Sequence, residues 1–139
     1  MSISNGTHRI VHLRPEAERE LGFAQARRIG DDLFVAGITS LADGFEVLHP
    51  DDMAAQVGEV YRALVDLLAA EGFAVADLVE ERVFVTDMAG FVAANSVRKA
   101  ILAGALPATT AVEIGALVLP GLMIEVAAFA RRGSPAGAS

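Results

Sequence analysis

The segment from Pro50 to Gly72 constrains the fold more than any other, because its apolar residues recur with the spacing of one helical face. Asp51 and Asp52 lie in the expected first turn, where the helix dipole favours negative charge, and Gly72 is placed to end the helix. A helix with one apolar stripe must bury that stripe, so the rest of the chain has to supply an apolar layer against it. The stripe consists of Met53, Val57, Val60, Leu64, Leu67 and Leu68.

The other apolar runs predict that this layer is a β-sheet. A second helix is expected over 89–103. The order β-β-β-α-β-α-β-β predicts one α+β domain over 1–139, with a mixed sheet and two helices on one face. Segment 14–20 is predicted to be a charged, exposed connection, and 133–139 a flexible tail. The strands are expected over 9–13, 23–29, 33–38, 78–87, 109–117 and 122–131.

Hydrophobic residues make up 53% of the chain, and its mean hydropathy is +0.46. The strand expected over 33–38 is apolar at nearly every position, which is typical of a strand that is covered on both faces. The two predicted helices cover only one face of the sheet. We therefore expect a second copy of the chain to cover the other face.

Charge and composition exclude several classes of function. Eleven Lys and Arg against eighteen Asp and Glu leave a net charge of −7, which argues against nucleic acid or an anionic membrane as a partner. The absence of cysteine excludes disulfides, thiolate nucleophiles and cysteine-ligated metals. His8 and His12 share a strand face without an obvious third ligand, so no metal or other cofactor is expected. With no apolar run of membrane-spanning length, we expect a cytoplasmic domain.

Two glutamates on the last predicted strands are candidates for proton transfer. If strands 109–117 and 122–131 pair as a hairpin around Leu119, Glu113 and Glu125 come close together on the face away from the helices. A carboxylate beside apolar groups has a raised pKa and can act as an acid or a base. The alternative is that both carboxylates are hydrogen-bonded on a solvated or rim surface and take no part in chemistry.

A third glutamate, Glu81, falls in register with the apolar residues Val79, Val83 and Val85 of strand 78–87. Burial of an unpaired carboxylate costs several kcal/mol, so Glu81 needs a partner or an exposed strand end. We interpret Glu81 as a structural residue.

Seven short stretches, in order and at matching spacings, make 23–132 resemble the RidA/YjgF family, also known as endoribonuclease L-PSP. The resemblance implies a chorismate-mutase-like fold and a homotrimer, in which three sheets form an inner barrel and small ligands bind between subunits. The best-known activity of the family is cofactor-free hydrolysis of reactive enamines and imines, such as 2-aminoacrylate, to 2-keto acids and ammonia. The stretches are 23–26, 29–37, the helix containing Gln56, 83–88, 91–95, 106–109 and 124–128.

Position by position, the resemblance implies a catalytic role for Glu125, which matches the glutamate of the family's last strand. Thr109 stands where the family has an arginine that clamps the substrate carboxylate. Phe23 replaces a tyrosine and Ala36 a serine, so two further polar groups are lost. The implied substrate-binding positions are Phe23, Ala36, Gly37, Asn95, Thr109 and Glu113.

Three functions remain open at this point. The first is an enzyme that deaminates an enamine or imine other than the standard 2-imino acids. The second is a trimer that binds a small ligand or regulates without turnover. The third, an endoribonuclease, is disfavoured because the chain is acidic and no histidine or lysine arrangement marks a cleavage site.

Overall fold

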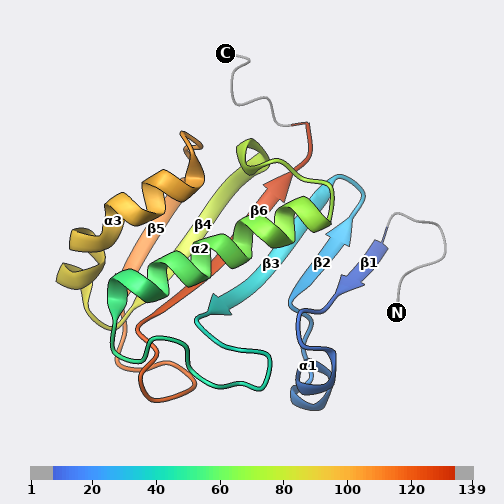
Figure 1. Cartoon of the computed structure of the whole chain (residues 1–139). Helices are drawn as coiled ribbons and strands as arrows, with labels where there is room; N and C mark the ends of the chain where they lie inside the picture. The colour runs from blue at the N-terminus through green and yellow to red at the C-terminus, as the bar shows by residue number, and fades with distance from the viewer. Residues whose placement is uncertain (1–7, 134–139) are drawn as a thin grey trace.

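The computed structural model describes residues 8–133, so the predicted tail lies outside the described residues apart from Gly133. Three helices, one 3-10 turn and six strands alternate along this part of the chain (Figure 1). In order they are β1 (His8–Val11), α1 (Pro15–Leu21), β2 (Ala26–Ile29), β3 (Asp32–Thr39), α2 (Met53–Ala70), η1 (Val75–Asp77), β4 (Leu78–Val85), α3 (Met88–Leu102), β5 (Ala108–Glu113) and β6 (Ile124–Arg131).

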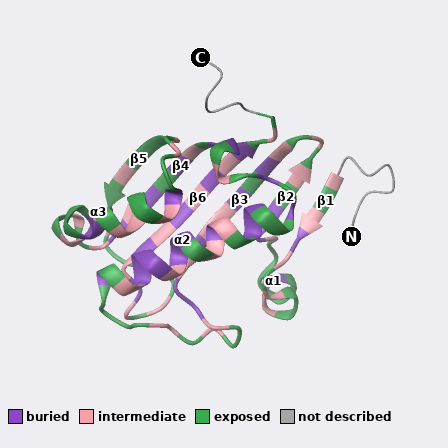
Figure 2. Cartoon of the chain, turned by 45° about the horizontal axis from the view of Figure 1, so that its top comes forward, coloured by how far each residue is buried: buried purple, intermediate pink, exposed green. Residues whose placement is uncertain are grey.

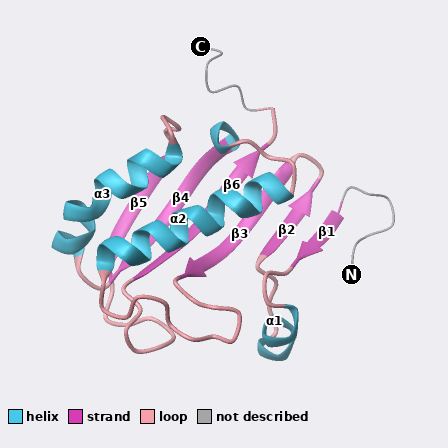
Figure 3. Ribbon diagram, in the orientation of Figure 1, coloured by secondary structure: helices cyan, strands magenta, loops and turns pink. Residues whose placement is uncertain are grey.

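The six strands form one mixed sheet in the order β1-β2-β3-β6-β4-β5. Every neighbouring pair is antiparallel except β4 and β5, which run parallel. The two long helices, α2 and α3, lie side by side across one face of this sheet (Figures 1 and 3). The α+β class, the mixed sheet and the helix layer predicted from the sequence are confirmed.

The core fills the space between these helices and the sheet. Leu64 and Leu68 of α2 are completely buried, as are Leu33, Val83 and Ile124 of the sheet (Figure 2). Aspartates define where both helices begin, because Asp52 caps α2 and Asp87 caps α3 through hydrogen bonds to backbone N–H groups. The predicted apolar stripe of 50–72 is thus the buried face of α2.

One predicted loop is in fact a helix. Most of segment 14–20, expected to be an exposed connection, belongs to α1, which begins with Pro15 and ends where Gly22 adopts φ +86°. Proline at the first position and glycine just after the end are typical helix boundaries, but the charge of the segment obscured them. Glu18 is only 1% exposed, so the segment is anchored to the domain.

The predicted hairpin of the last two strands is wrong. Strand β5 pairs with β4, whereas β6 lies between β3 and β4, so β5 and β6 are not neighbours. The physical reason is that α3 connects β4 to β5, and a strand-helix-strand unit places its strands in parallel and side by side. Glu113 is therefore in register with Val85 on the helix face, and Glu125 with Phe84 on the opposite face.

Candidate functional site

An irregularity in β3 makes room for Glu125. The register of β3 against β6 shifts between Val35 and Ile38, so Ala36 and Gly37 form a bulge. The carboxylate of Glu125 lies directly over the backbone of Gly37, where a Cβ atom would overlap it. Glycine is required at position 37 because any other residue would displace the Glu125 side chain.

Next to this bulge is a cavity of about 280 Å³. Four of the residues predicted from the sequence line it together, and they come from the segment before β2, from β3 and from β6. Arg14 and Glu18 close it on the side of α1, and Phe45 on the side of the loop after β3. The four predicted residues are Phe23, Ala36, Gly37 and Glu125.

The carboxylate of Glu125 lacks polar partners within the described part of the chain, and it is partly buried. Desolvation raises the pKa of Glu125 above its ordinary value, because burial disfavours the charged form. A carboxyl group with this property can hold a proton nearer to neutral pH and exchange it with a bound molecule. Glu125 therefore has the electrostatic character of an acid/base residue.

The other carboxylate of the cavity, Glu18, is fully occupied by the protein itself. Both of its oxygens accept hydrogen bonds, and this ties α1 to the chain before and after it. Such a carboxylate stabilises local structure and is not available to a ligand. The donors are His12 Nδ1 (2.7 Å), Leu13 N (3.1 Å), Arg14 N (2.5 Å) and Gln25 N (2.9 Å).

The remaining predicted site residues, Asn95, Thr109 and Glu113, lie on α3 and β5, beyond β4 from the Glu125 cavity. Glu113 accepts a hydrogen bond from the backbone N–H of Met88 at the start of α3 (2.8 Å). Asn95 and Thr109 both contact Arg98, at 3.3 and 3.1 Å. Within one chain, the four cavity residues thus form one group and Asn95 and Thr109 a second, whereas Glu113 is bonded to the start of α3.

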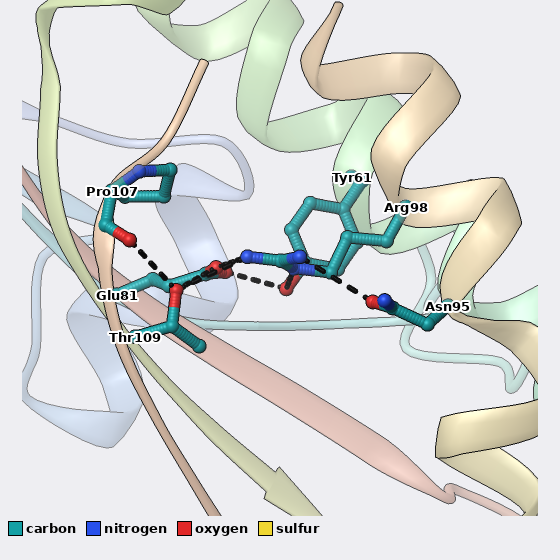
Figure 4. Close-up of polar contacts among 6 residues, drawn as sticks. All are labelled: Tyr61, Glu81, Asn95, Arg98, Pro107 and Thr109. Carbon is teal, nitrogen blue, oxygen red and sulfur yellow. Dashed lines mark hydrogen bonds and ion pairs between the residues drawn. The ribbon is translucent and has the colours of Figure 1, made fainter. Parts of the chain in front are cut away.

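Glu81 is the centre of the second group (Figure 4). It is completely buried, and its carboxylate accepts hydrogen bonds from the hydroxyl of Tyr61 (2.5 Å) and from Thr109 (2.7 Å), and pairs with Arg98. Burial, followed by the charge of Glu81, raises the pKa of the Tyr61 phenol, so this hydroxyl remains a donor. Burial is the largest single effect on Arg98 and lowers its pKa, but the hydrogen bond and charge of Glu81, together with the contacts to Tyr61, outweigh burial and raise that pKa. The buried carboxylate of Glu81 therefore has the polar partners that its position among the apolar residues of the strand made necessary.

Sequence reasoning missed Arg14, which was assigned to an exposed connection. Its Nε donates to the carbonyl oxygen of Ala42 (3.1 Å) and its Nη2 to that of Leu41 (2.7 Å). The guanidinium also lies 6.0 Å from the centre of the Phe45 ring. No sequence motif identifies this role, because it arises only when α1 folds against the loop after β3.

Residues 8–133 offer neither a metal-binding cluster nor a membrane-spanning helix. These residues contain no cluster of three or more histidine or acidic side chains arranged to bind a metal ion. In the same part of the chain, no helix is both long and apolar enough to span a membrane.

Comparison with known proteins identifies the family of the chain. The sequence model described as "Endoribonuclease L-PSP" matches residues 14–132, which include both groups of site residues. The chain belongs to this family. A curated family member from Acinetobacter baylyi, described as 3-aminoacrylate deaminase RutC, is 30% identical over 108 residues, which are 78% of this chain and 85% of that protein.

Solved structures of the endoribonuclease L-PSP and YjgF type share the fold. A Mycobacterium tuberculosis protein of the YjgF/YER057c/UK114 family is 32% identical, with a TM-score of 0.77 over 89% of this chain and 98% of that one. A Pseudomonas aeruginosa protein of unknown function is also 32% identical, with a TM-score of 0.70 over 81% of this chain and 82% of its own. The chain has the chorismate-mutase-like fold of this family.

Proposed function

We propose that the chain hydrolyses a small enamine or imine, other than the standard 2-imino acids, and releases ammonia. The observation that carries this proposal is the partly buried Glu125 carboxylate, which lines a cavity without a polar partner among the described residues. Family membership and the deaminase from Acinetobacter baylyi support the same reaction class.

Glu125 supplies the proton transfers that this hydrolysis needs. In its protonated form it donates a proton to the carbon of an enamine, which gives an iminium ion and a carboxylate. The carboxylate then takes a proton from water as the water oxygen bonds to the iminium carbon. Return of that proton to nitrogen makes ammonia the leaving group. The carbon–nitrogen bond breaks as the new hydroxyl group gives its proton to the carboxylate, so that a carbonyl compound and ammonia leave and Glu125 is again protonated.

The second group of residues supports a substrate other than a standard 2-imino acid. Thr109 has no charge, and its hydroxyl is bonded to Glu81. The nearby cation, Arg98, is paired with the carboxylate of Glu81 and is only 13% exposed. This edge of the sheet therefore offers no unpaired arginine to a carboxylate bonded to the reacting carbon.

We also propose that the chain functions as a homotrimer. The sheet face opposite the helices carries Phe34, which is 47% exposed, and Val112, which is 41% exposed. The Phe34 ring packs on that of Phe129 with centroids 5.0 Å apart, so apolar surface continues across neighbouring strands. In this arrangement, ligands bind in clefts between subunits, where residues of the two groups from different copies can meet.

A comparison of Glu125→Gln with the wild type tests the reaction. With 3-aminoacrylate generated in situ, the wild type should release ammonia faster than the uncatalysed background. Glu125→Gln should lower this rate at least tenfold, because the amide cannot take a proton from water. Glu16→Gln, an exposed change on α1, serves as the matched control and should retain the wild-type rate. Normal turnover by Glu125→Gln would contradict the proposed role, and ligand binding without turnover by the wild type would favour a non-catalytic trimer.

A further inference from the structure

A second charged side chain, Arg14, lines the cavity that contains Glu125. Arg14 immediately precedes α1, and Figure 1 shows α1 beside the loop that follows β3. The guanidinium holds these two segments together through the carbonyl oxygens of Leu41 and Ala42. Arg14 and Glu125 therefore belong to the same cavity, although they are 111 positions apart in the sequence (125 − 14).

The position of the Arg14 guanidinium is set before any ligand arrives. Nε and Nη2 are bound to carbonyl oxygens, the ring of Phe45 lies beneath the group, and Glu18 accepts from the backbone N–H of Arg14. Nη1 has no hydrogen-bond acceptor among residues 8–133. A guanidinium fixed in this way loses little conformational entropy when its remaining N–H groups bind a ligand.

The charge of Arg14 is not neutralised by the acidic residues around it. Both oxygens of Glu18 accept from backbone N–H groups and from His12, and the Arg14 guanidinium forms no ion pair with Glu125 or with any other described carboxylate. The protein thus places a partly buried cation without a counter-ion on a cavity wall, in a chain with a net charge of −7. An acidic group on the ligand would complete this arrangement.

We propose that Arg14 binds an acidic group of the substrate while the reacting carbon lies at Glu125. This inference rests on the proposed function and narrows the substrate class to small enamine or imine acids. Because Arg14 and Glu125 line one cavity without contacting each other, the substrate has to bridge them. In a 2-imino acid the carboxylate is bonded directly to the imine carbon. An acid with at least one carbon between the two groups, as in 3-aminoacrylate, reaches further across a cavity in which Arg14 and Glu125 do not pair with each other.

Binding of two matched probes to three proteins tests this role. Acetoacetate is a 3-oxo acid, the kind of product that hydrolysis of a 3-amino enamine acid leaves, and acetoacetamide is its uncharged counterpart. Isothermal titration calorimetry should show that Arg14→Gln weakens acetoacetate binding at least tenfold and leaves acetoacetamide binding unchanged. Arg19→Gln removes the same charge from an exposed position of α1 and should bind both probes as the wild type does.

Each other outcome overturns the inference in a distinguishable way. Equal acetoacetate binding by the wild type and Arg14→Gln shows that Arg14 does not bind the acidic group. Equal weakening of both probes shows that Arg14 only supports the loop after β3. A wild type that binds neither probe excludes this substrate class. The proposed reaction fails separately, if Glu125→Gln retains normal ammonia release whatever the result for Arg14.

Discussion

Three buried or partly buried glutamates show how differently one residue type can be used. Glu18 accepts four hydrogen bonds and Glu81 is paired with a guanidinium, so each carboxylate is compensated for its loss of water. Glu125 has no such compensation within the described residues, and desolvation alone raises its pKa. Uncompensated burial has no structural benefit, which distinguishes Glu125 from the other two.

The raised pKa of Glu125 predicts a pH-dependent effect on stability. Folding favours the protonated form, so the contribution of Glu125 is fully present below its unfolded pKa and is lost as pH rises through the folded value. Glu125→Gln should therefore be slightly more stable than the wild type at pH 7, and this difference should vanish below pH 4.5. Urea unfolding at both pH values measures it. A variant that is clearly less stable at pH 7 would show a structural role for the carboxylate.

Thr109 leads to a prediction about substrates. Without the family's arginine, a charge-assisted interaction worth about 1.5–3 kcal/mol is missing, so 2-aminoacrylate and related 2-imino acids should be poor substrates. Imines generated by an amino-acid oxidase and trapped with semicarbazide provide the assay. A family member that carries the arginine is the control, and equal rates for the two proteins would refute the prediction.

Individual residues were predictable to the extent that they interrupt a pattern. Glu125 stands out in an apolar strand and could be selected from that pattern, whereas Gly37 was selected only because it matches the family resemblance. Arg14 could not be selected, because its carbonyl partners are backbone atoms of a loop whose path the side chains of that loop do not reveal. The two-group arrangement of the site also depends on strand order, which periodicity does not determine.

At the scale of elements, the Glu81 cluster connects four of them. Tyr61 comes from α2, Arg98 from α3, Glu81 from β4 and Thr109 from β5 (Figure 4). The parallel pair of strands and both helices that cover it are thus joined by one polar group inside an apolar layer. Such a cluster favours a single arrangement of the elements, because any other arrangement leaves a buried charge without a partner.

Removal of one partner of Glu81 should therefore lower the stability of the fold. Arg98→Met leaves the carboxylate of Glu81 buried and unpaired, and should lower the free energy of unfolding by about 3–5 kcal/mol. Lys99→Met, at the next and exposed position of α3, should change it by less than about 0.5 kcal/mol. Urea unfolding of both variants gives the comparison. Equal stabilities for them would show that solvent compensates the Glu81 carboxylate.

Helices and strands with a clear hydrophobic periodicity were predicted well, whereas the pairing of strands with one another was not. The helix over 50–72 and the strand over 78–87 appear with boundaries shifted by two or three residues, because periodicity is a local property. The pairing of β5 was wrong since a hairpin and a crossover give the same alternation along the strand. Helix α1 was missed because its charged residues hide a single buried glutamate.

For the whole molecule, the two faces of the sheet differ. One is covered by α2 and α3 (Figure 1), and the other exposes Phe34 and Val112 in the single chain. Apolar surface of this kind, on a chain that is 53% hydrophobic, is typical of a subunit interface. It lies opposite the helices, on the face where the sequence predicts a second copy of the chain.

Gel filtration with light scattering should give a mass of about three times 14.5 kDa. Phe34→Glu places a charge in the apolar surface and should shift the protein toward monomers. Val92→Glu is the matched control, because Val92 is 66% exposed on α3 and the change should leave the mass unaltered. A stable wild-type monomer at micromolar concentration would contradict the trimer.

The place of β6 in the sheet has a consequence for synthesis in the cell. Strand β6 joins β3 to β4, and its Arg131 bonds to Asp32, 99 positions earlier. Until β6 leaves the ribosome, β1–β3 and β4–β5 are two separate half-sheets with unpaired edges, and the apolar stripe of α2 lacks the central strand beneath it. The nascent domain thus completes its sheet only after β6 has emerged, and contacts this distant in sequence form slowly. During that interval the unpaired edges can pair with strands of other chains, so the unfinished domain is prone to aggregate.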